Sequence, residues 1–183
     1  MRRILVAVSL LALVGVGVLF LMGRAGLGPL FRTRPHLLLV SIDTVRADAL
    51  GSYGYAKAQT PRLDALAAQG LRFEQATTVT PLTLPAHSSL LTGTFPATHG
   101  VRDNGGFYLG DEHVTLAEVL RGEGYRTGAF VGAFVLDSRW GTHQGFDRYF
   151  DEFDLSEMKG GGMASVQRSG DEVVAEALRW LGE

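Results

Sequence analysis

A continuous apolar run at residues 36–42, His-Leu-Leu-Leu-Val-Ser-Ile, is the feature that most constrains the fold. A strand with one solvent-exposed face alternates apolar and polar residues. An unbroken apolar run is typical of a strand in a parallel sheet, which is buried on both faces. Parallel strands need long crossover connections, which are usually helices. We therefore expect an α/β domain in which helices cover a mostly parallel sheet.

Helix signals alternate with strand-like segments along the rest of the chain. Thr60 and Pro61 predict a helix start, and Gly70 predicts its end. Residues 71–78 are expected to form a second extended segment, which leads to Thr83. Strands that alternate with helices in this way imply βαβ units.

The C-terminal half continues this alternation. Thr115 and Glu118 have the spacing of a capping box and predict a helix that ends near residues 122–124. Residues 125–131 are a further strand candidate, and the amphipathic stretch 171–181 predicts the last helix.

The N-terminus carries an uncharged apolar stretch from Ile4 to Met22. As a helix it would span about 28 Å, close to the hydrocarbon thickness of a bilayer. Arg2 and Arg3 precede it and favour a cytoplasmic N-terminus. We expect an uncleaved, single-pass anchor in the cell (inner) membrane, with the domain on the periplasmic or extracytoplasmic side. A cleaved signal peptide is the alternative.

The expected organisation has four parts. They are a cytoplasmic N-terminus (1–3), a transmembrane signal anchor (4–22), a glycine-containing linker (23–35) and the domain (36–183).

Charge and cysteine content exclude several functions. Residues 35–183 hold 12 Lys and Arg against 19 Asp and Glu, and this net charge of −7 argues against a nucleic-acid partner. The chain has no cysteine, so disulfides, thiol nucleophiles and cysteine-bound metals are excluded.

A hydroxyl stands at the start of a predicted helix in residues 83–93, Thr-Leu-Pro-Ala-His-Ser-Ser-Leu-Leu-Thr-Gly. A helix N-terminus offers unpaired N–H groups and a positive dipole end, which suit an anionic ester and an attacking alkoxide. Thr83 is therefore a candidate nucleophile. The alternative is an ordinary threonine N-cap with a proline in the first turn.

Asp43 and His87 are candidate partners of Thr83. Asp43 follows the first predicted strand, at the sheet edge where α/β proteins bind ligands, and could ligate a hard metal or merely cap a loop. His87 lies one helical turn after Thr83 and could orient the nucleophile, contact the ester or aid proton transfer, or simply pack against the sheet. Asp48 is expected to have a surface or turn role.

Asn104 lies in a glycine-flanked loop, residues 100–106, that allows close backbone approach to a ligand. Its amide could donate to a developing oxyanion, although asparagine before glycine is also common in simple turns. We expect His99 and Arg102, in the same region, to be structural or solvent-facing.

These residues together resemble the sulfatase and alkaline phosphatase superfamily from residue 36 to the C-terminus. The resemblance is carried by Asp43, the motif Thr-Pro-x-Leu-Asp64, the motif Thr83-x-Pro-x-His with its following Thr-Gly, and His99-Gly-Val. It implies an alkaline-phosphatase-like α/β/α sandwich and an anionic ester substrate. It also implies a divalent metal (Zn, Ca, Mg or Mn) held by Asp43 and Thr83, with Thr83 as nucleophile and His87 and Asn104 in catalytic positions.

Departures from the sulfatase pattern favour phosphorus chemistry. Sulfatases carry Cys or Ser, converted to formylglycine, where this chain has Thr83, and threonine cannot undergo that conversion. The Lys and His of a sulfatase Gly-Lys-Trp-His-Leu-Gly segment are absent from the corresponding residues 131–136. Thr83-x-Pro-x-His is similar to nucleotide pyrophosphatase/phosphodiesterases, which place an oxyanion-binding Asn downstream, as Asn104 is here. The resemblance thus favours phosphodiester cleavage or phosphoryl transfer over sulfate-ester hydrolysis.

The superfamily's remaining metal ligands, an Asp-His pair among them, have no counterpart before Glu183. We therefore expect this chain to be the N-terminal part of a sulfatase-like hydrolase, with an incomplete metal site and no activity alone. The alternative is a non-catalytic, membrane-tethered binding module that keeps half of the fold. The sequence specifies no protein partner.

Overall fold

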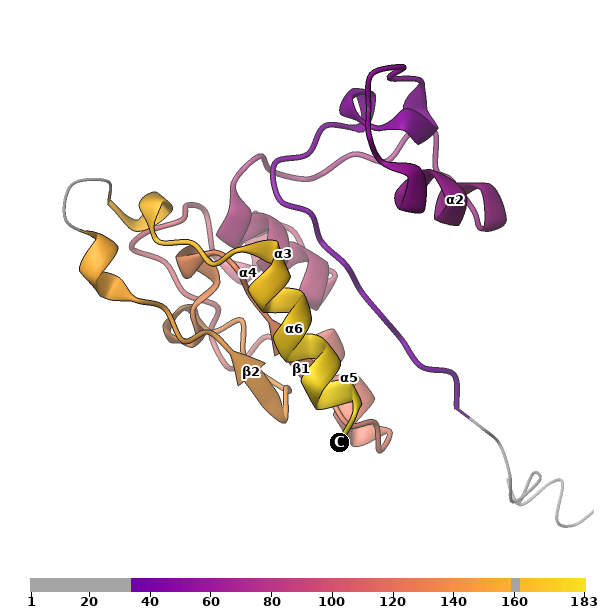
Figure 1. Cartoon of the computed structure of the whole chain (residues 1–183). Coiled ribbons are helices and arrows are strands. Elements are labelled where there is room, and N and C mark those ends of the chain that lie inside the picture. Colours follow the sequence, from indigo (N-terminus) through magenta and orange to yellow (C-terminus); the bar gives the residue numbers. More distant parts are fainter. Residues whose placement is uncertain (1–33, 159–161) are drawn as a thin grey trace, which may run out of the picture. The chain divides into compact units, whose positions relative to one another are not determined.

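The computed structural model describes residues 34–158 and 162–183 (Figure 1). The chain divides into two compact units, 1–41 and 42–183. The predicted anchor at 4–22, and all but the last two residues of the linker, lie outside the described residues. No helix within the described ranges is long and apolar enough to cross a bilayer.

The strand predicted at residues 36–42 is not formed. The segment has no strand pairing, and Leu38 is 80% exposed. Residues 71–78 are likewise irregular, with Leu71 91% exposed. A strand that is apolar on both faces is buried only where neighbouring strands pair with it and helices cover it. Neither segment has such neighbours among the described residues.

The second unit contains the regular elements. Its helices are α2 (Pro61–Gln69), α3 (Thr83–Thr92), α4 (Pro96–His99), α5 (Leu116–Gly122) and α6 (Gly170–Leu181). Its strands are β1 (Gly128–Phe130) and β2 (Arg148–Phe150). Short 3₁₀ turns are η1 (Ala47–Ala49), η2 (Gly51–Tyr53), η3 (Phe134–Leu136), η4 (Ser138–Trp140), η5 (Leu155–Met158) and η6 (Met163–Ser165). The helices predicted from residues 60, 83, 115 and 171 are thus confirmed.

The sheet is small and parallel, as the alternating pattern predicts. Gly128 pairs with Arg148, and Phe130 pairs with Phe150. Helix α6 packs on β1 through Trp180, whose ring centroid lies 5.9 Å from that of Phe130. A Cβ at Gly128 would lie 3.1 Å from the Trp180 ring, so the absence of a side chain lets the helix approach the strand.

The hydrophobic core includes the start of α3. Its fully or nearly fully buried members are Leu84, Val101, Leu109 and Leu136, with Phe107, Val131 and Trp140 packed against them. Leu84 is the second residue of α3. The core therefore fixes the end of the helix that carries Thr83.

Helix α5 begins with the capping box that the sequence predicts. The Thr115 hydroxyl accepts the Glu118 N–H at 3.2 Å, and the Glu118 carboxylate accepts the Thr115 N–H at 2.8 Å. The same hydroxyl lies 2.9 Å from the carbonyl of Gln144, to which it donates. The cap thus joins α5 to the loop before β2.

Replacing Thr115 with alanine should lower the free energy of unfolding by about 1–2 kcal/mol, because the cap bond and the link to Gln144 are lost together. Urea denaturation measures this. Thr98→Ala, at an exposed threonine of α4, is the matched control and should change stability by less than about 0.5 kcal/mol. Equal effects at the two positions would contradict the role of the cap.

Candidate active site

Thr83 is the first residue of α3 and is 8% exposed. The N-cap is Leu82, and no side chain caps the helix. The Thr83 hydroxyl instead donates to a carboxylate oxygen of Asp43, with 2.9 Å between Oγ1 and Oδ2. The hydroxyl is therefore not an ordinary helix cap, and it meets the acid that the sequence singles out 40 residues earlier.

Asp43 is exposed and is followed by a strained turn. Thr44 has φ 58°, and it is the one non-glycine residue with positive φ in the part of the chain that the structure describes. This left-handed conformation costs a side-chain-bearing residue about 1–2 kcal/mol, and it is unusual for a β-branched residue. Strained backbone of this kind clusters at functional sites. The turn changes the chain direction directly after the carboxylate that bonds Thr83.

His87 is half-buried and contacts the backbone of Thr83. Its Nδ1 lies 2.8 Å from the Thr83 carbonyl oxygen. A carbonyl only accepts, so Nδ1 carries the proton and donates. Of the roles predicted for His87, this contact supports the orientation of residue 83.

Asn104 contacts the same helix end. Its Oδ1 accepts the Leu84 N–H at 2.9 Å. Within the described ranges, the amide nitrogen of Asn104 has no partner. This amide therefore ties the 100–106 loop to α3 and keeps two N–H donors for a ligand, which is what an oxyanion-binding group requires.

The start of α3 offers fewer free donors than an ordinary helix. The Leu84 N–H is bonded to Asn104, Pro85 has no N–H, and the Ala86 N–H donates to the Leu82 carbonyl. The Thr83 N–H is the helix-end donor that remains without an intrahelical acceptor. An anion at this site would therefore depend on Asn104 as well as on the helix.

Asp43 and Thr83 supply hard oxygen donors of the kind that Mg²⁺ and Ca²⁺ prefer. Their separation of 2.9 Å is close to the roughly 3 Å between adjacent oxygens around an octahedral Mg²⁺. The described residues contain no cluster of three or more His, Cys, Asp or Glu side chains that could hold a metal. The two donors fit a hard cation in kind and spacing, but they are fewer than its coordination requires.

Other polar residues have structural roles. Asp48 forms a surface ion pair with Arg46, as expected. His113 lies 3.4 Å from Glu112 in the 110–115 loop. Residues 134–136 are buried in the core, so the positions corresponding to the sulfatase Lys and His segment include apolar packing residues.

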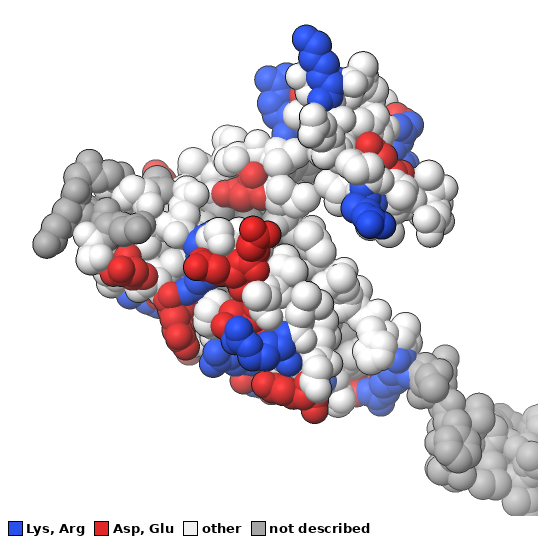
Figure 2. Space-filling view, viewed as in Figure 1, with Lys and Arg blue, Asp and Glu red and all other residues white. Residues whose placement is uncertain are grey.

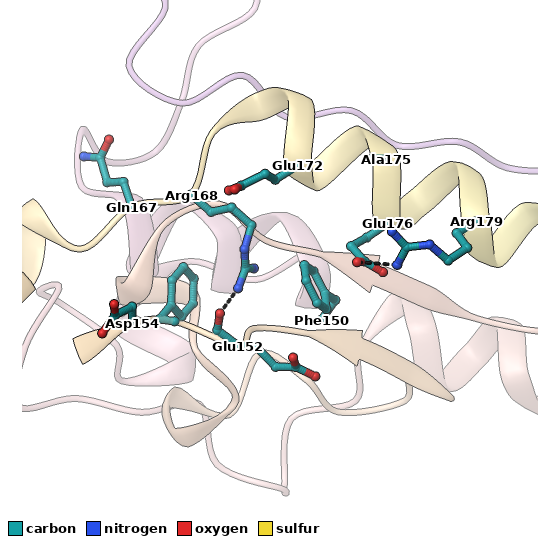
Figure 3. Close-up of a pocket in the computed structure, with 10 residues that line it drawn as sticks. Phe150, Glu152, Asp154, Gln167, Arg168, Glu172, Ala175, Glu176 and Arg179 are labelled. Carbon is teal, nitrogen blue, oxygen red and sulfur yellow. Dashed lines mark hydrogen bonds and ion pairs between the residues drawn. The ribbon is translucent and has the colours of Figure 1, made fainter. Parts of the chain in front are cut away.

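A separate cavity of about 430 Å³ lies between the end of β2 and α6 (Figure 3). Arg168 is central in it, with its guanidinium 4.1 Å from the centroid of the Phe150 ring and donating to the carbonyls of Glu152 and Val131. The full lining is Phe150, Glu152, Phe153, Asp154, Gln167, Arg168, Glu172, Ala175, Glu176 and Arg179. None of these is Thr83 or one of its partners, so the cavity is distinct from the candidate active site.

Acidic and basic side chains are interspersed on the face drawn in Figure 2. The described residues on that face form no continuous basic surface.

Comparison with known proteins assigns the family. The sulfatase family model matches residues 35–181. The chain is 41% identical over 105 residues to an ulvan-active sulfatase of Formosa agariphila, which covers 57% of this chain and 20% of that protein. It is 36% identical over 126 residues to human arylsulfatase A, and this match covers 63% of this chain and 24% of that protein. The chain therefore belongs to the sulfatase family, as its motifs predict.

Solved structures confirm the alkaline-phosphatase-like sulfatase fold. The phosphonate monoester hydrolase of Agrobacterium radiobacter superimposes with a TM-score of 0.64 at 27% identity. The match covers 82% of this chain and 38% of that one. The chain thus spans about a fifth to a quarter of the length of the two sulfatases above, and under two-fifths of this structural neighbour.

Proposed function

We propose that this chain carries the nucleophile region of a hydrolase that cleaves sulfuric or phosphoric esters through Thr83. The observation that supports this most is the hydrogen bond from the Thr83 hydroxyl to Asp43, made at the N-terminus of a helix. A neutral hydroxyl is a weak nucleophile, and a carboxylate within 3 Å is in reach of its proton.

The proposed first step forms a bond between Thr83 Oγ1 and the phosphorus or sulfur of the ester. The bond to the leaving oxygen breaks, and the hydroxyl proton moves toward Asp43. The amide N–H groups of Asn104 and the backbone N–H of Thr83 stabilise the non-bridging oxygens as charge develops. His87 holds the Thr83 carbonyl and so the orientation of the attacking residue. Water then hydrolyses the covalent Thr83 ester.

A divalent cation held partly by Asp43 and Thr83 would lower the pKa of the hydroxyl and neutralise charge on the ester. The cation would need further ligands beyond these two side chains.

Phosphodiesters are the proposed preferred substrates. Thr83 is an unmodified alcohol, and Gly132 and the buried Phe134 occupy the positions where sulfatases carry the Lys and His. The similarity to a phosphonate monoester hydrolase supports phosphorus chemistry, whereas the sulfatase relatives support sulfate esters as the alternative. The predicted anchor at residues 4–22 would place the site outside the cytoplasm.

Turnover of matched aryl esters tests this preference. We expect kcat/KM for bis-(4-nitrophenyl) phosphate to exceed that for 4-nitrophenyl sulfate by at least about tenfold, because Thr83 attacks directly and the basic sulfate-binding pair is missing. The full-length protein is assayed with Mg²⁺, Mn²⁺, Ca²⁺ or Zn²⁺ added in turn, alongside a metal-free sample with chelator. Faster cleavage of the aryl sulfate would overturn the preference.

A non-catalytic, membrane-tethered binding module is the second candidate, motivated by the small number of metal-ligating residues. It predicts that the anionic ester binds but is released unchanged under every metal condition. Product formation that depends on Thr83 would exclude it.

A further inference from the structure

His99, at the end of α4, is 3% exposed and has its proton position fixed by its neighbours. Its Nδ1 lies 3.2 Å from the backbone nitrogen of Val101. A backbone N–H can only donate, so Nδ1 accepts and carries no proton. Neutral His99 therefore carries its proton on Nε2.

The second nitrogen of His99 reaches the helix of the nucleophile. Nε2 lies 2.9 Å from the hydroxyl oxygen of Ser89, and that hydroxyl lies 2.9 Å from the carbonyl oxygen of Pro85. The carbonyl only accepts, so Ser89 donates to Pro85 and accepts from His99. The bonds thus run in one direction, from the Val101 N–H to Nδ1 and from the Nε2–H through Ser89 to Pro85.

This chain of hydrogen bonds contacts both segments that carry the candidate site, the start of α3 with Thr83 and the loop with Asn104. Pro85 follows Thr83 by two residues in α3. Val101 is fully buried, and Asn104, three residues later, accepts the Leu84 N–H. His99 therefore anchors the start of the 100–106 loop through the Val101 N–H. It also anchors the first turn of α3, through Ser89 and the Pro85 carbonyl.

We infer that His99 is a positioning residue for Thr83 and Asn104, and that it acts only in the neutral form. The inference rests on the proposed function for its effect on turnover. A second proton would sit on Nδ1 and face the Val101 N–H, so the contact that anchors the loop would become a repulsion between two donors.

The surroundings of His99 oppose that second proton. Burial, and then the nearby His113, lower the pKa of His99 below its ordinary value. The His113 ring lies 6.5 Å away in an edge-on arrangement, and Glu112 contacts His113 at 3.4 Å and lines the same cavity as His99. Ser89 and Pro85, from α3, bring no charge.

Acidification removes the contribution of neutral His99 to stability. The unfolded chain takes up the proton near pH 6.5, before the folded chain does. The stability that neutral His99 contributes is therefore present above pH 6.5. It is lost as the pH falls from there toward the folded-state value.

The first test measures the tautomer and needs no turnover. Long-range ¹H–¹⁵N spectra of the protein should show His99 as the Nε2–H tautomer at pH 7.5. Amide exchange at Val101 and Leu84, corrected for intrinsic rates, should lose protection on acidification in the wild type and stay constant in His99→Gln. Glutamine can donate to Ser89 and does not titrate. An Nδ1–H tautomer, or equal acid sensitivity in both proteins, would overturn the inference.

The second test measures turnover. Below the His99 pKa, wild-type kcat/KM should fall about tenfold per pH unit, and His99→Gln should lack this acid limb. His99→Phe, which fills the space but forms neither bond, should lower kcat/KM by up to about 10²-fold at pH 7.5. His143→Gln, at an exposed histidine, is the control and should keep the wild-type profile. An acid limb that persists in His99→Gln would refute the positioning role even if Thr83 proves to be the nucleophile.

Discussion

Thr83→Ala in the full-length protein is expected to lower kcat for phosphate and sulfate esters by at least about 10³-fold, because it removes the oxygen proposed to attack the ester. The loss should be accompanied by the absence of any covalent adduct. In the wild type turning over bis-(4-nitrophenyl) phosphate, rapid acid quench and mass spectrometry should find a 4-nitrophenyl phosphoryl group on the peptide that contains residues 83–93, because one nitrophenolate leaves and the other stays on phosphorus.

Two variants control this experiment. Thr83→Ser keeps the hydroxyl and should retain measurable turnover and the adduct. Thr78→Ala removes an exposed hydroxyl that donates to the Thr80 carbonyl, and it should behave as the wild type. Substantial turnover by Thr83→Ala would remove Thr83 as the nucleophile.

Asp43→Asn is expected to lower kcat/KM by about 10²–10⁴-fold. Asparagine has nearly the same shape and can still accept a hydrogen bond from Thr83. It lacks the charge that draws the hydroxyl proton and that would bind a cation. Stability should change little, because Asp43 is exposed. Stopped-flow turnover and urea denaturation measure the two quantities separately.

Asp48→Asn is the matched control for Asp43. Asp48 is also exposed and lies five residues later, but it pairs with Arg46 on the surface. It should keep turnover within about twofold of the wild type, since exposed ion pairs contribute little. If the two variants lose activity equally, the effect belongs to local charge and not to the bond with Thr83.

The helices could be predicted because their signals are local. Thr115 and Glu118 form both bonds of the capping box that their spacing predicts. The helix that starts at Thr83 ends at Gly93, which adopts the left-handed conformation expected of a terminating glycine. These features depend on a few neighbouring residues, so sequence alone determines them.

The conformation of residues 36–42 could not be predicted in the same way. An apolar run becomes a buried strand only where neighbouring strands pair with it and helices cover it. The site shows the same limit. Sequence position suggested Asp43, Thr83 and Asn104 individually, but the bond across 40 residues and the bond from Asn104 to Leu84 are tertiary. His99 was expected to be structural or solvent-facing. It is structural, and its relay through Ser89 has no sequence signature beyond two polar residues ten positions apart.

The two uses proposed for the Asn104 amide would make affinity a property of a conformational equilibrium. One end of the amide is occupied by the helix, and the other end is the donor proposed for the ester. Only molecules in which Asn104 of the 100–106 loop accepts the Leu84 N–H of α3 would then present both of its amide N–H groups to an anion. The apparent dissociation constant is the intrinsic one divided by the fraction of molecules in that state. Substitutions far from the ester can therefore change affinity by changing how often the loop is seated.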